Sequence, residues 1–390
     1  MRVAHIITRM IIGGAQENTL YNCADLIEQY DDDVLLITGP AVGPEGSLLQ
    51  RNNNTIVPVQ NAQHLIRNIH PWHDTLAYFE LKKILRQFKP DVVHTHSAKA
   101  GLLGRMAATS LKVPAVIHTV HGAPFHPYQN AVARNTFIAC EKYAAKKCHK
   151  MVCVADAMSA LMLDAGIASP EKYETVYSGM EVEPFLEGHK LREASRAELG
   201  FEPQHVVIGK IARLFHLKGH EYVIQAAKEI VENCPDVRFL FIGDGILQDQ
   251  YRQQIAEAGL TDYFVMPGLV SPSEIPKMIS AMDILVHTSL REGLARALPQ
   301  ALLSGKPAVS FDVDGAREVV INDETGALLP AKDVTQLTSA LIRLANDSDL
   351  RKKLGDEGQR RMKTQFPHQV MTARLREIYQ EVLDFNGKSV

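Results

Sequence analysis

The feature that most constrains the fold is a regular alternation of short apolar, β-branched runs with helical patterns along nearly the whole chain. Apolar runs of this kind are typical of strands buried on both faces, as in parallel sheets covered by helices. Helical patterns such as 75–88 and 135–148 separate the runs, and the chain is expected to be helical from about Asp333 onward. The expected strands are 3–8, 33–38, 91–97, 115–120, 151–155, 174–179, 205–211, 237–245, 263–268, 283–289 and 308–313.

The alternation is interrupted once, by Glu183-Pro184-Phe185 and the charged stretch 188–204. A chain of 390 residues is also longer than a single ordinary core requires. We therefore expect an α/β protein with two doubly wound domains, the first ending near residue 185.

Charge and cysteine content narrow the functional classes. The net charge is −3, which gives no electrostatic case for nucleic-acid binding. The five cysteines form no C-x-x-C pair, as expected for reduced thiols in a cytoplasmic protein. The apolar N-terminus is interpreted as a first strand rather than a signal peptide, and no stretch approaches the ~20 apolar residues that span a bilayer.

In doubly wound sheets, ligands bind beyond the carboxyl ends of the strands, so the residues after each strand are the informative ones. Gly13-Gly14 follows the first strand and opens a helix, where backbone N–H groups can approach an anion. The pair lacks the G-x-G-x-x-G spacing of dinucleotide-binding enzymes, and a plain tight turn is the alternative.

Histidines end two other strands of the first half. His118 and His121 belong to HTVHG (118–122), where an imidazole can hydrogen-bond a sugar hydroxyl. His94 and His96 lie on one face of their strand and could bind a metal ion, but no carboxylate or cysteine accompanies them locally. We favour a lining or structural role for this pair, and we expect no metal site.

In the second half, Arg213 and Lys218 lie in the loop between a strand and a helix, followed by Gly219. Two cations aimed at a helix start suit a phosphate, although an ordinary solvated loop is the alternative. Gly243-Asp244-Gly245 is a weaker signal, because D-G is also a common turn.

The segment VHTSLREGLARALPQALLSGKPAV (286–309) places Glu292-Gly293 where a helix is expected to begin, with Gln300 on that helix. This arrangement suits an elongated ligand with a diphosphate at the helix end; the alternative for Gln300 is a partly exposed helix residue. The D-x-D sequence Asp312-Val313-Asp314 resembles a metal motif, but we interpret it as coincidental.

Taken together, these motifs resemble glycosyltransferase family four, the large retaining family of GT-B fold. The resemblance covers essentially the whole chain and rests on GGAQ (13–16), THSAKAG (95–101), HTVHG (118–122), SGMEVEPF (178–185), ARLFHLKG (212–219), GDG (243–245), PGLV (267–270), REGLARALPQALLSGKP (291–307) and DGAREVV (314–320). It implies two Rossmann-like domains facing a cleft. Residues 1–185, with a C-terminal helix at about 368–390 that crosses back, would bind the acceptor, and residues 186–367 the nucleotide-sugar donor.

The resemblance also implies residue roles. The catalytic set would be His121, the cleft histidine, with Glu292, which holds the donor sugar, and Arg213 and Lys218, which grip the diphosphate. Val270 would cradle the base, and backbone N–H groups at Ala295 and Arg296 would meet phosphate. The implied donor-binding residues are Gly14, Arg213, Lys218, Gly243, Val270, Glu292, Gly293, Leu294, Ala295, Arg296 and Gln300.

Two positions depart from the family pattern. Gln300 replaces the second glutamate of the E-x7-E motif, which holds the ribose hydroxyls, and it keeps an acceptor oxygen. Leu294-Ala295 replaces the usual Phe-Gly after Glu-Gly.

The expected function is that of a retaining, metal-independent glycosyltransferase. It would move a sugar from a nucleotide-sugar, expected to be a UDP-sugar, to a glycan or lipid-linked acceptor in surface polysaccharide or glycoconjugate synthesis, without a cofactor. The basic stretches 81–89 and 141–150 have two interpretations. Either they are ordinary solvated helix faces, or they bring a cytoplasmic enzyme to the anionic inner face of the membrane. A UDP-sugar 2-epimerase of the same fold and a non-catalytic nucleotide-sugar-binding module are the alternatives.

Overall fold

The computed structural model describes residues 1–40, 48–51 and 56–387, and it divides the chain into two compact units. Unit 1 comprises Met1–Met180 and Pro367–Val390, and unit 2 comprises Glu181–Phe366. The sequence-based boundaries at 185 and 367 lie close to these divisions. Segments 41–47, 52–55 and 388–390 of the expected first domain lie outside the described residues.

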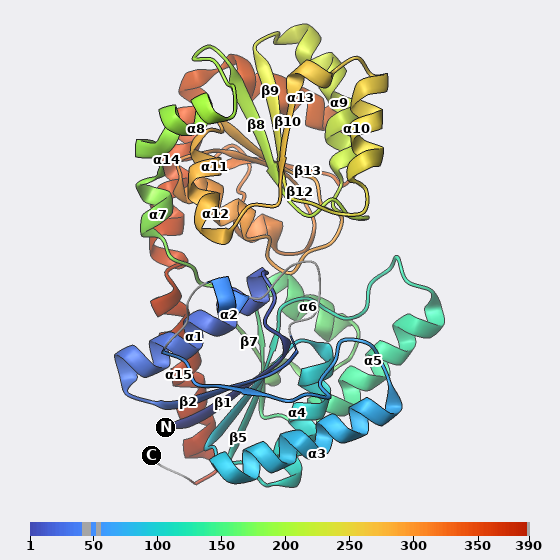
Figure 1. Ribbon diagram of the computed structural model, residues 1–390, viewed down its shortest axis with the longest axis vertical. Helices are drawn as coiled ribbons and strands as arrows, with labels where there is room; N and C mark the ends of the chain where they lie inside the picture. The colour runs from blue at the N-terminus through green and yellow to red at the C-terminus, as the bar shows by residue number, and fades with distance from the viewer. Residues whose placement is uncertain (41–47, 52–55, 388–390) are drawn as a thin grey trace. The chain divides into compact units, whose positions relative to one another are not determined.

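Unit 1 contains a parallel sheet with the strand order β3-β2-β1-β4-β5-β6-β7. Strands β1, β2, β5 and β7 of this sheet are labelled in Figure 1. Helix α4 packs on β4, β1 and β5, whereas α1 and α15 pack together, with α15 on β5. The strands are β1 (Arg2–Arg9), β2 (Asp33–Gly39), β3 (Val59–Asn61), β4 (Val92–His96), β5 (Ala115–Val120), β6 (Lys150–Cys153) and β7 (Tyr173–Thr175). The helices are α1 (Gly14–Tyr30), α2 (Leu48–Arg51), α3 (Pro71–Phe88), α4 (Ala98–Ser110), α5 (Ala131–Ala145), α6 (Asp156–Asp164) and α15 (His368–Phe385).

Helix α15 confirms the expected crossing back of the C-terminal segment. Its apolar face completes the core that β1 and α1 begin, with Leu375, Ile378 and Tyr379 almost fully buried. Asp25 of α1 accepts hydrogen bonds from His368 Nδ1 at 2.8 Å and from Thr372 Oγ1 at 2.7 Å. The first unit is therefore built from both ends of the chain.

Unit 2 contains a second parallel sheet with the order β10-β9-β8-β11-β12-β13. The expected class of two Rossmann-like α/β domains is thus confirmed. The strands are β8 (Val206–Ile211), β9 (Val237–Ile242), β10 (Phe264–Gly268), β11 (Ile284–His287), β12 (Ala308–Phe311) and β13 (Gly326–Leu329). The helices are α7 (Glu183–Leu186), α8 (Arg192–Glu198), α9 (His220–Asn233), α10 (Gln248–Glu257), α11 (Ile275–Ser280), α12 (Ala297–Leu303), α13 (Val334–Asn346) and α14 (Ser348–Gln365).

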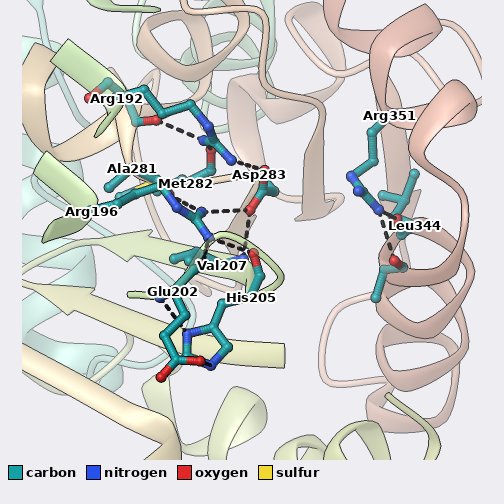
Figure 2. Close-up of polar contacts among 12 residues, drawn as sticks. Arg192, Arg196, Glu202, His205, Val207, Ala281, Met282, Asp283, Leu344 and Arg351 are labelled. Carbon is teal, nitrogen blue, oxygen red and sulfur yellow. Dashed lines mark hydrogen bonds and ion pairs between the residues drawn. The ribbon is translucent and has the colours of Figure 1, made fainter. Parts of the chain in front are cut away.

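A polar network ties α8 to the amino ends of β8 and β11 (Figure 2). Asp283 accepts hydrogen bonds from Arg192 Nη2 at 2.6 Å, from Arg196 Nη1 at 3.3 Å and from the backbone N–H of Val207 at 2.8 Å. Arg196 also donates to the carbonyl oxygens of Ala281, Glu202 and His205. The charged stretch after the domain boundary thus anchors α8 at the amino ends of the strands, opposite to their carboxyl ends.

Candidate functional site

Two loops of unit 2 meet beyond the carboxyl ends of the neighbouring strands β8 and β11. Gly219 ends the first loop with φ +71°, and a Cβ there would lie 1.9 Å from the carbonyl oxygen of Thr288 in the second. The backbone N–H of Leu290 donates to the carbonyl oxygen of Leu217 at 2.8 Å. A glycine is therefore required for the two loops to pack, and the packing brings Lys218 close to Glu292.

The Lys218 ammonium lies 2.6 Å from Glu292 Oε1, and His287 Nε2 lies 3.6 Å from the same oxygen. Burial alone would raise the pKa of Glu292, but Lys218 and His287 outweigh it and hold that pKa well below its ordinary value. Glu292 is therefore a carboxylate, able to accept hydrogen bonds from hydroxyl groups.

Asp314, which follows β12, fixes the backbone of this turn. Its Oδ2 accepts the backbone N–H of Glu292 at 2.6 Å, and the backbone N–H of Gly315 donates to the carbonyl oxygen of Gly293 at 3.2 Å. Asp312 instead forms a two-point ion pair with Arg317, at 2.9 and 2.6 Å. The two carboxylates of the D-x-D sequence thus bond different partners.

The Gly-Asp-Gly turn after β9 allows a third loop to approach the same edge. Gly243 has φ +138°, and a Cβ on it would lie 2.1 Å from the carbonyl oxygen of Ala212. Its backbone N–H donates to the carbonyl oxygen of Gly268 at 3.0 Å. Gly268 lies two residues before Val270, which is half-buried. Gly243 is therefore needed where the loops that carry Arg213 and Val270 come together.

The remaining predicted donor residues lie in the turn 292–296 and on α12. The expectation of a helix beginning directly at Glu292-Gly293 was wrong, because α12 begins at Ala297. Leu294 and Ala295 are buried, whereas Arg296 is half-buried. Gln300 is half-buried on α12, and its side chain has no hydrogen bond to the residues that the structure describes. Its amide is thus available to a ligand.

Sequence reasoning missed Lys210, which lies on β8 behind the ion pair. Its side chain is fully buried, and its ammonium donates to Thr288 Oγ1 at 3.0 Å. Burial lowers the pKa of Lys210 to about 7, although Glu292 opposes the shift. The available signal was a lysine inside the apolar run HVVIGKIAR (205–213).

Arg213 is exposed, and its guanidinium lies 4.7 Å from the centre of the Phe215 ring. Stacking against an aromatic face restricts the flexible side chain and leaves the planar fork oriented. The structure therefore places Arg213, Lys218, Gly243 and Glu292 at one edge of the unit 2 sheet.

In unit 1, the two predicted residues also follow strands. Gly14 is the first residue of α1, after β1, and half-buried His121 lies just beyond β5. His96 Nδ1 lies 3.0 Å from His121 Nε2. His94 is fully buried and contacts the hydroxyls of Tyr379 at 2.5 Å and Thr119 at 2.6 Å.

A metal ion was not expected at His94 and His96, but the structure adds His5 from β1 to them. One ring nitrogen of each of the three residues lies within 4.8 Å of the others. Among the described residues, these three histidines are the group close enough together to hold a metal ion. Within the same described ranges, no helix is both long and apolar enough to cross a membrane.

Two family profiles match successive parts of the chain. Residues 12–184 match Glycosyltransferase Family 4, and residues 192–361 match Glycosyl transferases group 1. One relative is a UDP-Gal:alpha-D-GlcNAc-diphosphoundecaprenol alpha-1,3-galactosyltransferase of Escherichia coli, 29% identical over 90% of this chain and 89% of that protein. Another is the capsular polysaccharide biosynthesis glycosyltransferase CapM of Staphylococcus aureus, 25% identical over 88% and 89%.

Solved structures share the fold. The Anabaena protein HepE in complex with UDP has a TM-score of 0.83 and 21% identity, covering 98% of this chain and all of that one. A complex of the same protein with UDP-glucose has a TM-score of 0.82 and 20% identity, covering 98% of this chain and 100% of that one.

Proposed function

Because the chain belongs to the family 4 glycosyltransferases of GT-B fold, we propose that it transfers a sugar from a UDP-sugar to a glycan or lipid-linked acceptor with retention of anomeric configuration. The E. coli relative is named for a UDP-sugar donor and a diphosphoundecaprenol-linked acceptor, and the S. aureus relative for capsular polysaccharide biosynthesis. A role in surface polysaccharide or glycoconjugate synthesis is proposed on this basis.

The ion pair between Lys218 and Glu292 is the observation that carries the proposal. It places a cation and an ionised carboxylate at one ligand-binding edge, where a diphosphate and the hydroxyls of its attached sugar need opposite partners. On donor binding, the Lys218 ammonium would donate one or more of its hydrogen bonds to the diphosphate. Glu292 would accept hydrogen bonds from the sugar hydroxyls.

Arg213 and Lys218 would stabilise the departing diphosphate, where negative charge grows as the bond to the sugar breaks. The acceptor oxygen would bond to the anomeric carbon on the face that the diphosphate leaves, and the acceptor proton would pass to a diphosphate oxygen. This front-face route gives retention without a covalent nucleophile. Because cationic side chains take the role of a divalent ion, we propose that neither a metal nor a cofactor is needed.

The other predicted residues would complete donor binding. Gln300 would bond the ribose hydroxyls, Val270 would contact the base, and backbone N–H groups at Ala295 and Arg296 would meet phosphate. Gly14 would let the backbone of unit 1 approach the diphosphate, and His121 would hydrogen-bond the reacting sugar. Each of these assignments is a proposal that rests on the family pattern.

The test is a panel of UDP-sugars incubated with the full chain and with lipid-diphosphate-linked or glycan acceptors, with UDP release and product formation measured together. We expect one donor to give an acceptor-dependent product whose anomeric configuration, determined by NMR, matches that of the donor. An inverted product would contradict retention. Release of a free epimerised sugar without acceptor would favour the epimerase, and UDP-sugar binding without turnover would favour a binding module.

We also propose peripheral association with an anionic membrane. Trp72 and Phe79 of α3 are 68% and 60% exposed, and Lys83 and Arg86 are exposed on the same helix. Exposed aromatic groups beside basic side chains suit an interface of anionic lipid headgroups, where each nearby cation contributes ~1 kcal/mol. Flotation with anionic and with neutral liposomes tests this: binding should require anionic lipid and weaken with salt, and a lack of flotation at low salt would contradict it.

A further inference from the structure

Three imidazoles form a continuous hydrogen-bonded series that runs from His5, in the middle of β1, to His96 and His121 at the carboxyl ends of β4 and β5. His5 Nδ1 lies 3.0 Å from His96 Nε2, and His96 Nδ1 lies 3.0 Å from His121 Nε2. The ring planes differ by only 15° in the first pair and 30° in the second, with centroids 5.3 Å apart in both. Each ring therefore meets the next in its own plane, nitrogen to nitrogen.

This geometry distinguishes a hydrogen-bonded chain from a metal site. Metal ligands direct their lone pairs at one common point, whereas His5 and His96 direct nitrogen atoms at each other. His94, the third member of the possible metal group, has both of its nitrogens within 2.6 Å of hydroxyl groups, those of Tyr379 and Thr119. The observations therefore favour hydrogen bonding over metal binding.

His5, at the buried end of the hydrogen-bonded series, determines which ring donates and which accepts in each hydrogen bond. His5 Nε2 is buried and has no hydrogen-bond partner among the residues that the structure describes. If protons lay on the Nε2 atoms, this nitrogen would be an orphaned buried N–H donor, which folded proteins avoid more strictly than an orphaned acceptor. With protons on the Nδ1 atoms, His5 donates to His96, and His96 donates to His121.

Burial keeps the inner rings neutral, as this arrangement requires. It lowers the pKa of His5 to about 3 and holds the pKa of His96 well below the ordinary histidine value. The hydrogen bond made by one ring nitrogen fixes the tautomer at the other. His121 is half-buried and is the last imidazole of the hydrogen-bonded series. Its tautomer is therefore fixed by the hydrogen bond that its Nε2 accepts from His96.

We propose that His96, supported by His5, is a positioning residue that holds His121 as the Nδ1–H tautomer, so that His121 acts on the bound sugar as a hydrogen-bond donor and not as a base. The proposal rests on the role given to His121 in the proposed function. It fits a front-face route, in which the acceptor proton passes to the leaving diphosphate and no side-chain base is needed.

Two substitutions at position 96 separate positioning from simple packing. In His96→Asn, the amide N–H occupies the position of the imidazole Nδ1 and can still donate to His121. In His96→Gln, the amide reaches toward His5 and the contact with His121 is lost. His94→Gln is the matched control, because His94 lies on the same face of β4, is equally buried and makes no hydrogen bond to His121.

The full chain is labelled with ¹⁵N-histidine, and long-range ¹H–¹⁵N correlation spectra report the tautomer of each ring. We expect His121 as the neutral Nδ1–H form in the parent, His96→Asn and His94→Gln, and as a mixture in His96→Gln. Turnover at saturating donor should fall about tenfold in His96→Gln only, the loss expected for one hydrogen bond, with the KM for the donor within about threefold of the parent.

An Nε2–H or protonated His121 in the parent overturns the proposal, as does an unchanged tautomer in His96→Gln. Joint shifts of the His5, His94 and His96 nitrogens on addition of Zn²⁺ alone would show a metal site and also overturn it. The spectra do not depend on turnover. A parent that transfers no sugar would therefore refute the proposed function, whereas the tautomer result would stand separately.

Discussion

Replacement of Gln300 by alanine should weaken nucleotide binding without affecting the fold. The Gln300 side chain is half-buried and has no hydrogen bond to the described residues, so its removal leaves no protein group unpaired. Alanine is also a better helix former than glutamine. We therefore expect the free energy of unfolding to stay within about 0.5 kcal/mol of the parent.

The effect on binding is predicted to be much larger. If the amide of Gln300 bonds the ribose hydroxyls, Gln300→Ala leaves them unpaired in the complex, which costs about 1–3 kcal/mol. This corresponds to UDP affinity about 5- to 150-fold weaker than that of the parent. Gln300→Glu keeps an acceptor and restores the residue usual in the family, so its UDP affinity should stay within about threefold.

Isothermal titration calorimetry with UDP provides the measurement, and urea unfolding of the same preparations provides the stability check. Gln253→Ala is the control, because Gln253 is an exposed glutamine of α10 outside the candidate site. UDP binding by Gln300→Ala at parental affinity would refute the assignment. Residue 300 would then be an ordinary helix position.

Four further outcomes follow from the structure. Arg213→Ala and Lys218→Ala should each lower turnover by about 10²-fold, as for other lost leaving-group contacts, and near-parental rates in both would refute the diphosphate assignment. Transfer should persist in excess chelator, whereas loss of activity with rescue by Mn²⁺ would reveal a metal requirement. Asp283→Ala leaves the buried Arg196 without its carboxylate and should lower the free energy of unfolding by about 3–5 kcal/mol. Asp323→Ala removes an exposed ion pair with Arg343 and should lower it by under about 1 kcal/mol. Equal urea midpoints for the two variants would contradict this. The pKa of Glu292 is lowered in the folded protein, so its carboxylate contributes its full stabilisation above the unfolded pKa of about 4.3 and less as the pH falls below that value. The difference in unfolding free energy between the parent and Glu292→Gln should therefore narrow from about pH 6 to about pH 3. A difference that stays constant over this range would contradict the lowered pKa.

The fold was largely predictable because buried parallel strands leave a strong apolar signal. Two strands escaped prediction for a physical reason. β3, Val59–Asn61, is an exposed edge strand of only three residues and shows no apolar run. β13, Gly326–Leu329, is four residues long and partly buried, so it is too short to stand out from the loop before α13. Both lie at sheet edges, where one neighbouring strand suffices to define them.

The candidate site was predictable where it depends on residue type after a strand, and not where it depends on three-dimensional neighbours. Lys218 and Glu292 were identified in separate loops, but their ion pair results from the packing of Gly219 on Thr288. Nothing in the sequence indicated that His5 would join His96, because 91 residues separate them. Only the pairing of β1 with β4 brings them together.

The construction of unit 1 from both ends of the chain has a consequence for its biosynthesis. A ribosome releases β1 to β7 long before α15, and the intervening unit takes roughly 10–40 s to translate at about 5–20 residues per second. During that interval, the sheet face that Leu375, Ile378 and Tyr379 later cover lacks its helix. The nascent N-terminal unit therefore offers an apolar surface to chaperones, while the second unit, continuous in sequence, can complete its own core first.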